Sequence, residues 1–79
     1  MKLSIVSPEE TLYEGEVKSV KMQGIDGKFQ VLNDHAPLIS ALSKGEIKII
    51  EEESGEEKVF AINSGLVELA KNEIHILAQ

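Results

Sequence analysis

The chain has 79 residues, a net charge of −6 and no cysteine. The length predicts one domain, residues 1–79, with a small core. The acidic charge disfavours binding to nucleic acid or anionic lipid, and the missing thiols exclude disulfides and thiolate metal sites. Its N-terminal residues lack a signal-peptide core, and no apolar run approaches the ~20 residues of a transmembrane helix. We therefore expect a soluble, cytosolic domain.

Short apolar or alternating segments follow one another along the whole chain. In order, the predicted strands are residues 3–6, 11–13, 17–22, 29–32, 38–42, 46–49, 58–62, 66–70 and 73–78. Gly15 is expected to bend or bulge the chain between the second and third of them. No segment has a helical period. The pattern predicts an all-β fold, an antiparallel β-sandwich or flattened barrel.

Turn residues separate these strands. Residues 24–27 contain an Asp-Gly pair that tolerates the positive φ of a tight reversal, and residues 33–35 (Asn-Asp-His) predict a polar corner. Because Pro37 cannot donate a ladder hydrogen bond, the strand that follows it should start at an edge or after a bend. Residues 51–57 predict a charged hairpin tip, and Lys71 and Asn72 a two-residue hairpin connection.

Several strands carry apolar residues on both faces, as at Val6, Ile50 and Leu66. A two-layer sandwich needs only one apolar face on each strand. The surplus residues are explained equally well by contact with a second protein or by loops that wrap a flattened barrel.

The sequence shows no constellation that predicts catalysis, a metal site or a cofactor. The two histidines, His35 and His75, are too few and too far apart for a metal site. His35, at a polar corner, is expected to hydrogen-bond the turn. The Val-Lys-Met run around Lys21 is similar to the modified-lysine motif of biotin and lipoyl carrier domains. However, this lysine lies inside a predicted strand, whereas a carrier presents it at a hairpin tip.

Three ordered segments together resemble one family. Residues 27–38, Gly-Lys-Phe-Gln-Val-Leu-Asn-Asp-His-Ala-Pro-Leu, are similar to the Gly-x-Phe/Leu-Gly-x-Leu-Pro-Gly-His-Ala-Pro-Leu segment of the ε subunit of F-type ATP synthases. Residues 6–17 resemble the opening two strands of that family, and residues 63–68 its Gly-Gly-x-x-Glu turn. The similarity covers the whole chain in order.

This resemblance implies a β-sandwich of about ten short strands that is not an enzyme and holds no cofactor. It implies a central-stalk rotor subunit that links the γ subunit to the membrane c-ring of a proton-translocating ATP synthase and couples rotation to ATP synthesis. Such a subunit lies at the cytoplasmic face of the bacterial inner membrane, peripheral to it. A free-standing biotinyl- or lipoyl-like carrier, or a ligand-binding β-domain, remains the alternative.

The resemblance also implies contact residues. The turn formed by Ile25, Asp26, Gly27 and Lys28 is expected to face the c-ring, and His35 to lie near the edge shared by γ and the ring. Many family members have an acidic residue where Lys28 stands, which would invert the charge of that contact. Family members usually continue into a helical hairpin, whereas this sequence stops after its last strand. We expect such a form to couple the rotor without the inhibition that this hairpin exerts in some members.

Overall fold

The computed structural model describes all 79 residues and contains eight strands and no helix. The strands are β1 (Lys2–Val6), β2 (Thr11–Gly24), β3 (Gly27–Leu32), β4 (Leu38–Leu42), β5 (Gly45–Glu51), β6 (Glu57–Ile62), β7 (Gly65–Ala70) and β8 (Glu73–Ala78). The chain therefore has no helix that could span a membrane.

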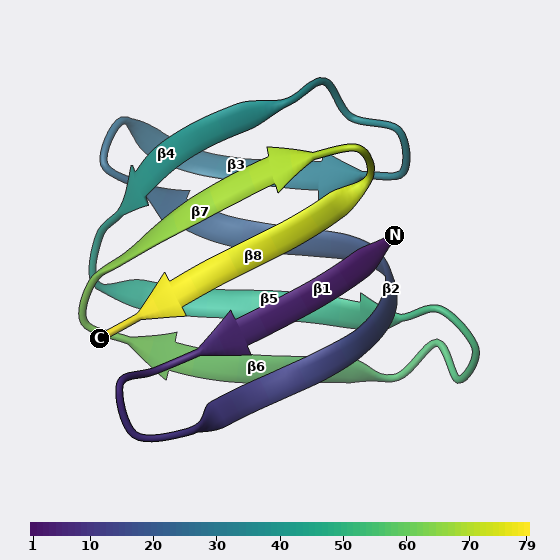
Figure 1. The fold of residues 1–79 in the computed structure, drawn as a ribbon, viewed down its shortest axis with the longest axis horizontal. Coiled ribbons are helices and arrows are strands. Elements are labelled where there is room, and N and C mark those ends of the chain that lie inside the picture. The colour runs from purple at the N-terminus through teal and green to yellow at the C-terminus, as the bar shows by residue number, and fades with distance from the viewer.

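The strands form two layers that face one another (Figure 1). One layer has the order β1-β8-β7-β4, and the other consists of β3, β2, β5 and β6. All pairs are antiparallel except β1–β8, which is parallel. The all-β sandwich predicted from the sequence is confirmed, with eight strands in place of about ten.

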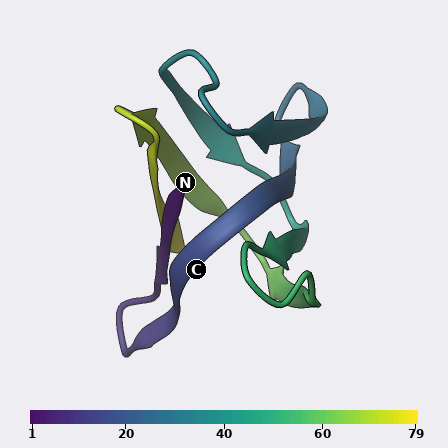
Figure 2. The same cartoon turned by 90° about the vertical axis from the view of Figure 1, so that its right-hand side faces the viewer.

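The long strand β2 joins the two layers. Its first half pairs with β1 and its second half with β3 and β5, so that it crosses diagonally from one layer to the other (Figure 2). The crossing coincides with a β-bulge, because Val17 is paired with Glu51 and Ser19 with Ile50. The extra residue resets the alternation, and Val17, Ser19, Val20 and Met22 are all buried.

The predicted break at Gly15 was wrong. Residues 11–13 and 17–22 belong to one continuous strand, and the irregularity lies between Val17 and Ser19. Gly15 serves a different purpose, since a Cβ atom there would lie 2.9 Å from the Tyr13 hydroxyl. Glycine therefore makes room for the Tyr13 side chain within a regular strand.

The core lies between the layers and consists of 16 buried apolar residues, which are Met1 and residues from all eight strands. β8 shows the pattern most clearly, since Ile74, Ile76 and Ala78 point inward while Glu73, His75 and Leu77 point outward. Tyr13, Phe29 and Phe60 pack against the margins of this core. Strict alternation therefore sends a second set of side chains to the outer faces.

Candidate partner-binding surfaces

The turn predicted to face a partner is a tight β2–β3 hairpin. Gly24 is paired with Gly27, which leaves Ile25 and Asp26 at the tip. Gly27 has a φ of +127°, a conformation that side chains rarely adopt. The Ile25 amide donates to the Ala41 carbonyl at 3.2 Å. The hairpin is thereby anchored to β4, while the Ile25 side chain is 65% exposed.

The polar corner after β3 is held by the β7–β8 turn. Asp34 has a φ of +62°, and its amide donates to Asn72 Oδ1 at 2.9 Å. Asn72 Nδ2 donates in turn to Asn33 Oδ1 at 3.1 Å. His35 is exposed, and its Nδ1 lies 2.7 Å from the Ala36 carbonyl oxygen. The predicted left-handed corner is confirmed at Asp34, and Asn72 supplies side-chain hydrogen bonds that sequence reasoning did not identify.

The five contact residues predicted from the sequence fall into two groups. Ile25, Asp26, Gly27 and Lys28 lie at one end of β3, and His35 follows the other end. Gly27 and Lys28 are the first two residues of β3, and the other four, Phe29–Leu32, separate the groups by roughly 13 Å at about 3.3 Å per residue. These residues therefore do not form one compact site.

An apolar row crosses the outer face of the β1-β8-β7-β4 layer. Val6 is paired with Leu77, Leu77 with Leu66, and Leu66 with Ala41. Leu66 is 44% exposed and Leu77 is 55% exposed. Ile39, on the same face and 71% exposed, lies two residues from Ala41 along β4. We call these five residues the apolar row; it contains two of the surplus residues noted in the sequence.

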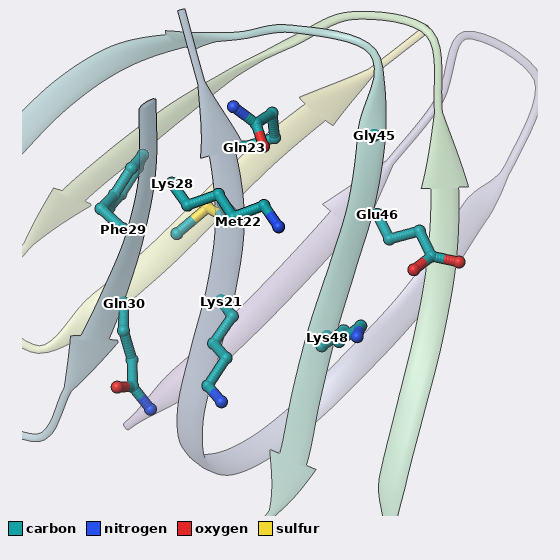
Figure 3. Close-up of a pocket in the computed structure, with 9 residues that line it drawn as sticks. All are labelled: Lys21, Met22, Gln23, Lys28, Phe29, Gln30, Gly45, Glu46 and Lys48. Carbon is teal, nitrogen blue, oxygen red and sulfur yellow. The ribbon is translucent and has the colours of Figure 1, made fainter. Parts of the chain in front are cut away.

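The other layer carries a basic groove of about 690 Å³ on its outer face. It is lined by Lys21, Met22, Gln23, Lys28, Phe29, Gln30, Gly45, Glu46 and Lys48. Figure 3 shows Lys21, Lys28 and Lys48 on β2, β3 and β5, where they share the outer face of the sheet, while Met22 and Phe29 alternate with them and face the core. Lys21 lies in the interior of β2 rather than at a hairpin tip, which is the position that a carrier lysine occupies.

A third cluster closes the side of the sandwich between β2 and the β5–β6 hairpin. Tyr13 donates to Glu51 Oε2 at 2.8 Å, Ser54 donates to Glu51 Oε1 at 2.9 Å, and Lys58 Nζ lies 3.4 Å from Glu51 Oε2. The Tyr13 ring packs against Phe60 at a centroid distance of 5.8 Å. We call this cluster the Tyr13 latch.

The latch shifts two acid–base equilibria. The hydrogen bond from Tyr13, then that from Ser54, and the nearby Lys58 hold the pKa of Glu51 below its usual value. Burial, followed by the hydrogen bond to Glu51, raises the pKa of Tyr13 to about 12. The prediction that residue 51 belongs to a solvated tip was wrong, because Glu51 ends β5. In the sequence, the alternation of Ile47, Ile49 and Glu51 was the available signal. It places Glu51 on the same inward face as the two isoleucines, where a carboxylate needs a hydrogen-bonding partner.

The fold and its surfaces define a small β-sandwich with two chemically different outer faces. Comparison with known proteins gives the family. The model of the ATP synthase Delta/Epsilon chain, beta-sandwich domain, matches residues 1–79, and the chain belongs to that family.

Relatives named "ATP synthase epsilon chain" support this membership. The chain is 44% identical to one from Leptospira interrogans (98% of this chain, 59% of the relative) and 45% identical to one from Helicobacter pylori (99% and 62%). It is 37% identical to one from Chlorobium limicola, covering 99% of this chain and 88% of the relative. The chain thus spans about three fifths of the Leptospira and Helicobacter relatives.

Two solved structures share the fold. One is the central stalk and c-ring of the Tetrahymena thermophila mitochondrial ATP synthase, with a TM-score of 0.80 at 18% identity, covering all of this chain and 63% of the other. The other comes from the Euglena gracilis mitochondrial ATP synthase (OSCP/F1/c-ring), with a TM-score of 0.87 at 19% identity over 96% of this chain and 48% of the other.

Proposed function

We propose that this protein is a non-catalytic central-stalk subunit of a proton-translocating ATP synthase. It links the γ subunit to the c-ring, and the assembled complex places it at the cytoplasmic face of a bacterial inner membrane, without lipid insertion. Family membership over all 79 residues carries this proposal. The structural neighbours, one of them described as a central stalk and c-ring, are consistent with it.

The apolar row is the proposed contact with γ. A rotor subunit must stay attached under torque, and long-lived interfaces have apolar, well-packed centres. Leu66 and Leu77 are paired across β7 and β8, and Val6 and Ala41 extend the same row to the neighbouring strands. Each of these side chains emerges from a regular strand, so the surface is rigid before binding and little ordering entropy is lost.

The β2–β3 hairpin is the proposed contact with the c-ring. Its tip carries the exposed Ile25 and Asp26, and the hairpin is held against β4 by the Ile25–Ala41 hydrogen bond. His35 lies beyond the far end of β3 and follows Asp34, which the β7–β8 turn fixes. We therefore assign His35 to the margin of the γ contact and the hairpin to the ring, which uses the two ends of β3 for two partners.

Binding to purified γ tests the proposal. A Leu66→Glu/Leu77→Glu variant should lose capture by γ, because two side chains that the interface would bury become charged. Hot-spot side chains of this kind are each worth about 2 kcal/mol or more. Val59→Gln is the control, since Val59 is 46% exposed but lies on β6 in the other layer, and a neutral side chain adds no charge opposite its cross-strand neighbour Lys48. Circular dichroism should show both variants folded. Capture that is equally strong for both, or no capture of the wild type, would contradict the proposal.

A further inference from the structure

The lysines of the basic groove have no partner within the chain. Among the eight lysines only Lys58 forms an ion pair, so Lys21, Lys28 and Lys48 are unpaired like most of the others, but these three share one face. Lys21 and Lys48 are directly opposite each other on adjacent strands. Like charges in that position destabilise a sheet. The free protein therefore keeps a repulsive arrangement that a complementary anionic partner would relieve.

The composition of the groove indicates the kind of anion. Its lining adds the amide groups of Gln23 and Gln30 to the three ammonium groups, with Glu46 as the one acidic member. The three lysines are exposed, and no buried charged side chain fixes an orientation. Sites for small ligands enclose them and use a few fixed polar groups, whereas exposed charges of one sign are typical of protein contacts that steer association.

A bilayer fits less well than a polypeptide loop. An anionic membrane is an extended surface that would also meet the carboxylates around the groove, and the chain as a whole carries a charge of −6. A loop contacts the groove alone. The groove also includes Lys28, which belongs to the β2–β3 hairpin proposed above as a contact with the ring.

We propose that the basic groove of β2, β3 and β5 binds an acidic segment of a partner polypeptide in the assembled complex, carboxylates pairing with Lys21, Lys28 and Lys48. This inference rests on the proposed function, because the partner is a component of the same complex. It adds a second, charge-dependent contact to the apolar one.

Zero-length cross-linking in the purified ATP synthase tests this pairing. A carbodiimide joins an amine to a carboxylate only when the two are in contact, and mass spectrometry then identifies both residues. We expect cross-links from Lys21, Lys28 or Lys48 to Asp or Glu of another subunit. Lys18, which is exposed on β2 but does not line the groove, is the matched control and should form none. Intersubunit cross-links from Lys18 alone, or from no lysine, would overturn the proposal.

Binding kinetics provide a second readout. A Lys21→Gln/Lys28→Gln/Lys48→Gln variant should associate with the subunit-depleted complex roughly tenfold more slowly at low salt, since steering charges act mainly on the association rate. The deficit should vanish near 0.5 M salt, where screening acts within roughly 5 Å. Lys18→Gln should behave as the wild type, and an equal loss in both variants would count against the groove.

Two further outcomes separate this proposal from the proposed function. If the wild-type subunit co-purifies with γ but its groove lysines stay free of cross-links, the central-stalk role stands and the acidic partner is refuted. If it does not co-purify, both fall. Protection of the three lysines from acetylation is the last readout. If phosphatidylglycerol vesicles protect them and the complex does not, the groove binds a lipid surface in place of a polypeptide.

Discussion

The two outer faces of this sandwich are built alike and differ in chemistry. On the β1-β8-β7-β4 layer, Val6, Leu77, Leu66 and Ala41 are neighbours across the strands and form an apolar row. On the other layer, the corresponding cross-strand row is formed by Gln30, Lys21 and Lys48.

If both faces bind partners as proposed, one small domain serves two contacts of different chemistry. An apolar row gives affinity that depends little on salt, whereas a basic row acts on encounter rate and on orientation. Both rows occupy outward positions of strands whose inward positions form the shared core. Either face can therefore change its chemistry without a change of fold, as long as the alternation is kept.

The sharpest test of this division lies within β8, where Ile76 is fully buried and Leu77 is 55% exposed. Ile76→Ala should lower the free energy of unfolding by about 2–5 kcal/mol, because it leaves a cavity in the core. Leu77→Ala should change it by less than about 0.5 kcal/mol, as expected for a surface position. Urea denaturation measures both. Similar losses in the two variants would place Leu77 in the core and remove it from the apolar row.

The backbone beneath the apolar row gives the next largest effect. A Cβ atom at Gly65 would lie 2.8 Å from the Leu77 carbonyl oxygen, a backbone atom that cannot rotate away. Gly65→Ala should therefore push β7 from β8 at the Leu66–Leu77 pair and cost about 1–3 kcal/mol, as overpacking does. Thermal unfolding measures the cost, with Ser64→Ala as the control. A γ affinity that survives a large loss of stability would show that binding tolerates a displaced row.

Much of this fold was predictable because alternation and turn chemistry act locally. The tight turn at Gly27 and the left-handed corner at Asp34 follow from the conformational preferences of Gly and Asp. The continuity of β2 did not follow, because a β-bulge depends on which strands it joins. The parallel β1–β8 pair likewise depends on how the two ends of the chain meet in space.

The candidate site was predictable only in part, for the same reason. The surplus apolar residues were visible in the sequence, but the row appears only once the register pairs Val6, Leu77, Leu66 and Ala41. The basic groove joins Lys21, Lys28 and Lys48 from three strands, and no local pattern brings them together. The contacts predicted at Ile25–Lys28 and His35 stay predictions, now assigned to opposite ends of β3.

The Tyr13 latch tests whether the two layers keep their mutual orientation. Tyr13→Phe removes the 2.8 Å hydrogen bond to Glu51 and keeps the ring packed on Phe60. We expect a loss of about 0.5–1.5 kcal/mol, the usual net contribution of a hydrogen bond. A double-mutant cycle with Glu51→Gln isolates this interaction from the other partners of Glu51. A coupling energy near zero would mean that the latch does not join the layers.

The smallest expected effect is the contribution of the Tyr13 latch to the pH dependence of stability. The pKa of Glu51 is lowered in the folded state, so its contribution is present above its unfolded value near 4.5 and is lost as the pH falls below it. The pKa of Tyr13 is raised from 10.0 to about 12, so its contribution is complete below pH 10 and is lost as the pH rises toward 12. The urea midpoint of the wild type relative to Tyr13→Phe, measured from pH 3 to pH 11, should therefore be largest at intermediate pH and shrink at both ends. A flat difference across this range would show that Tyr13 and Glu51 do not interact in solution, and the two outer faces would then be held together by the core alone.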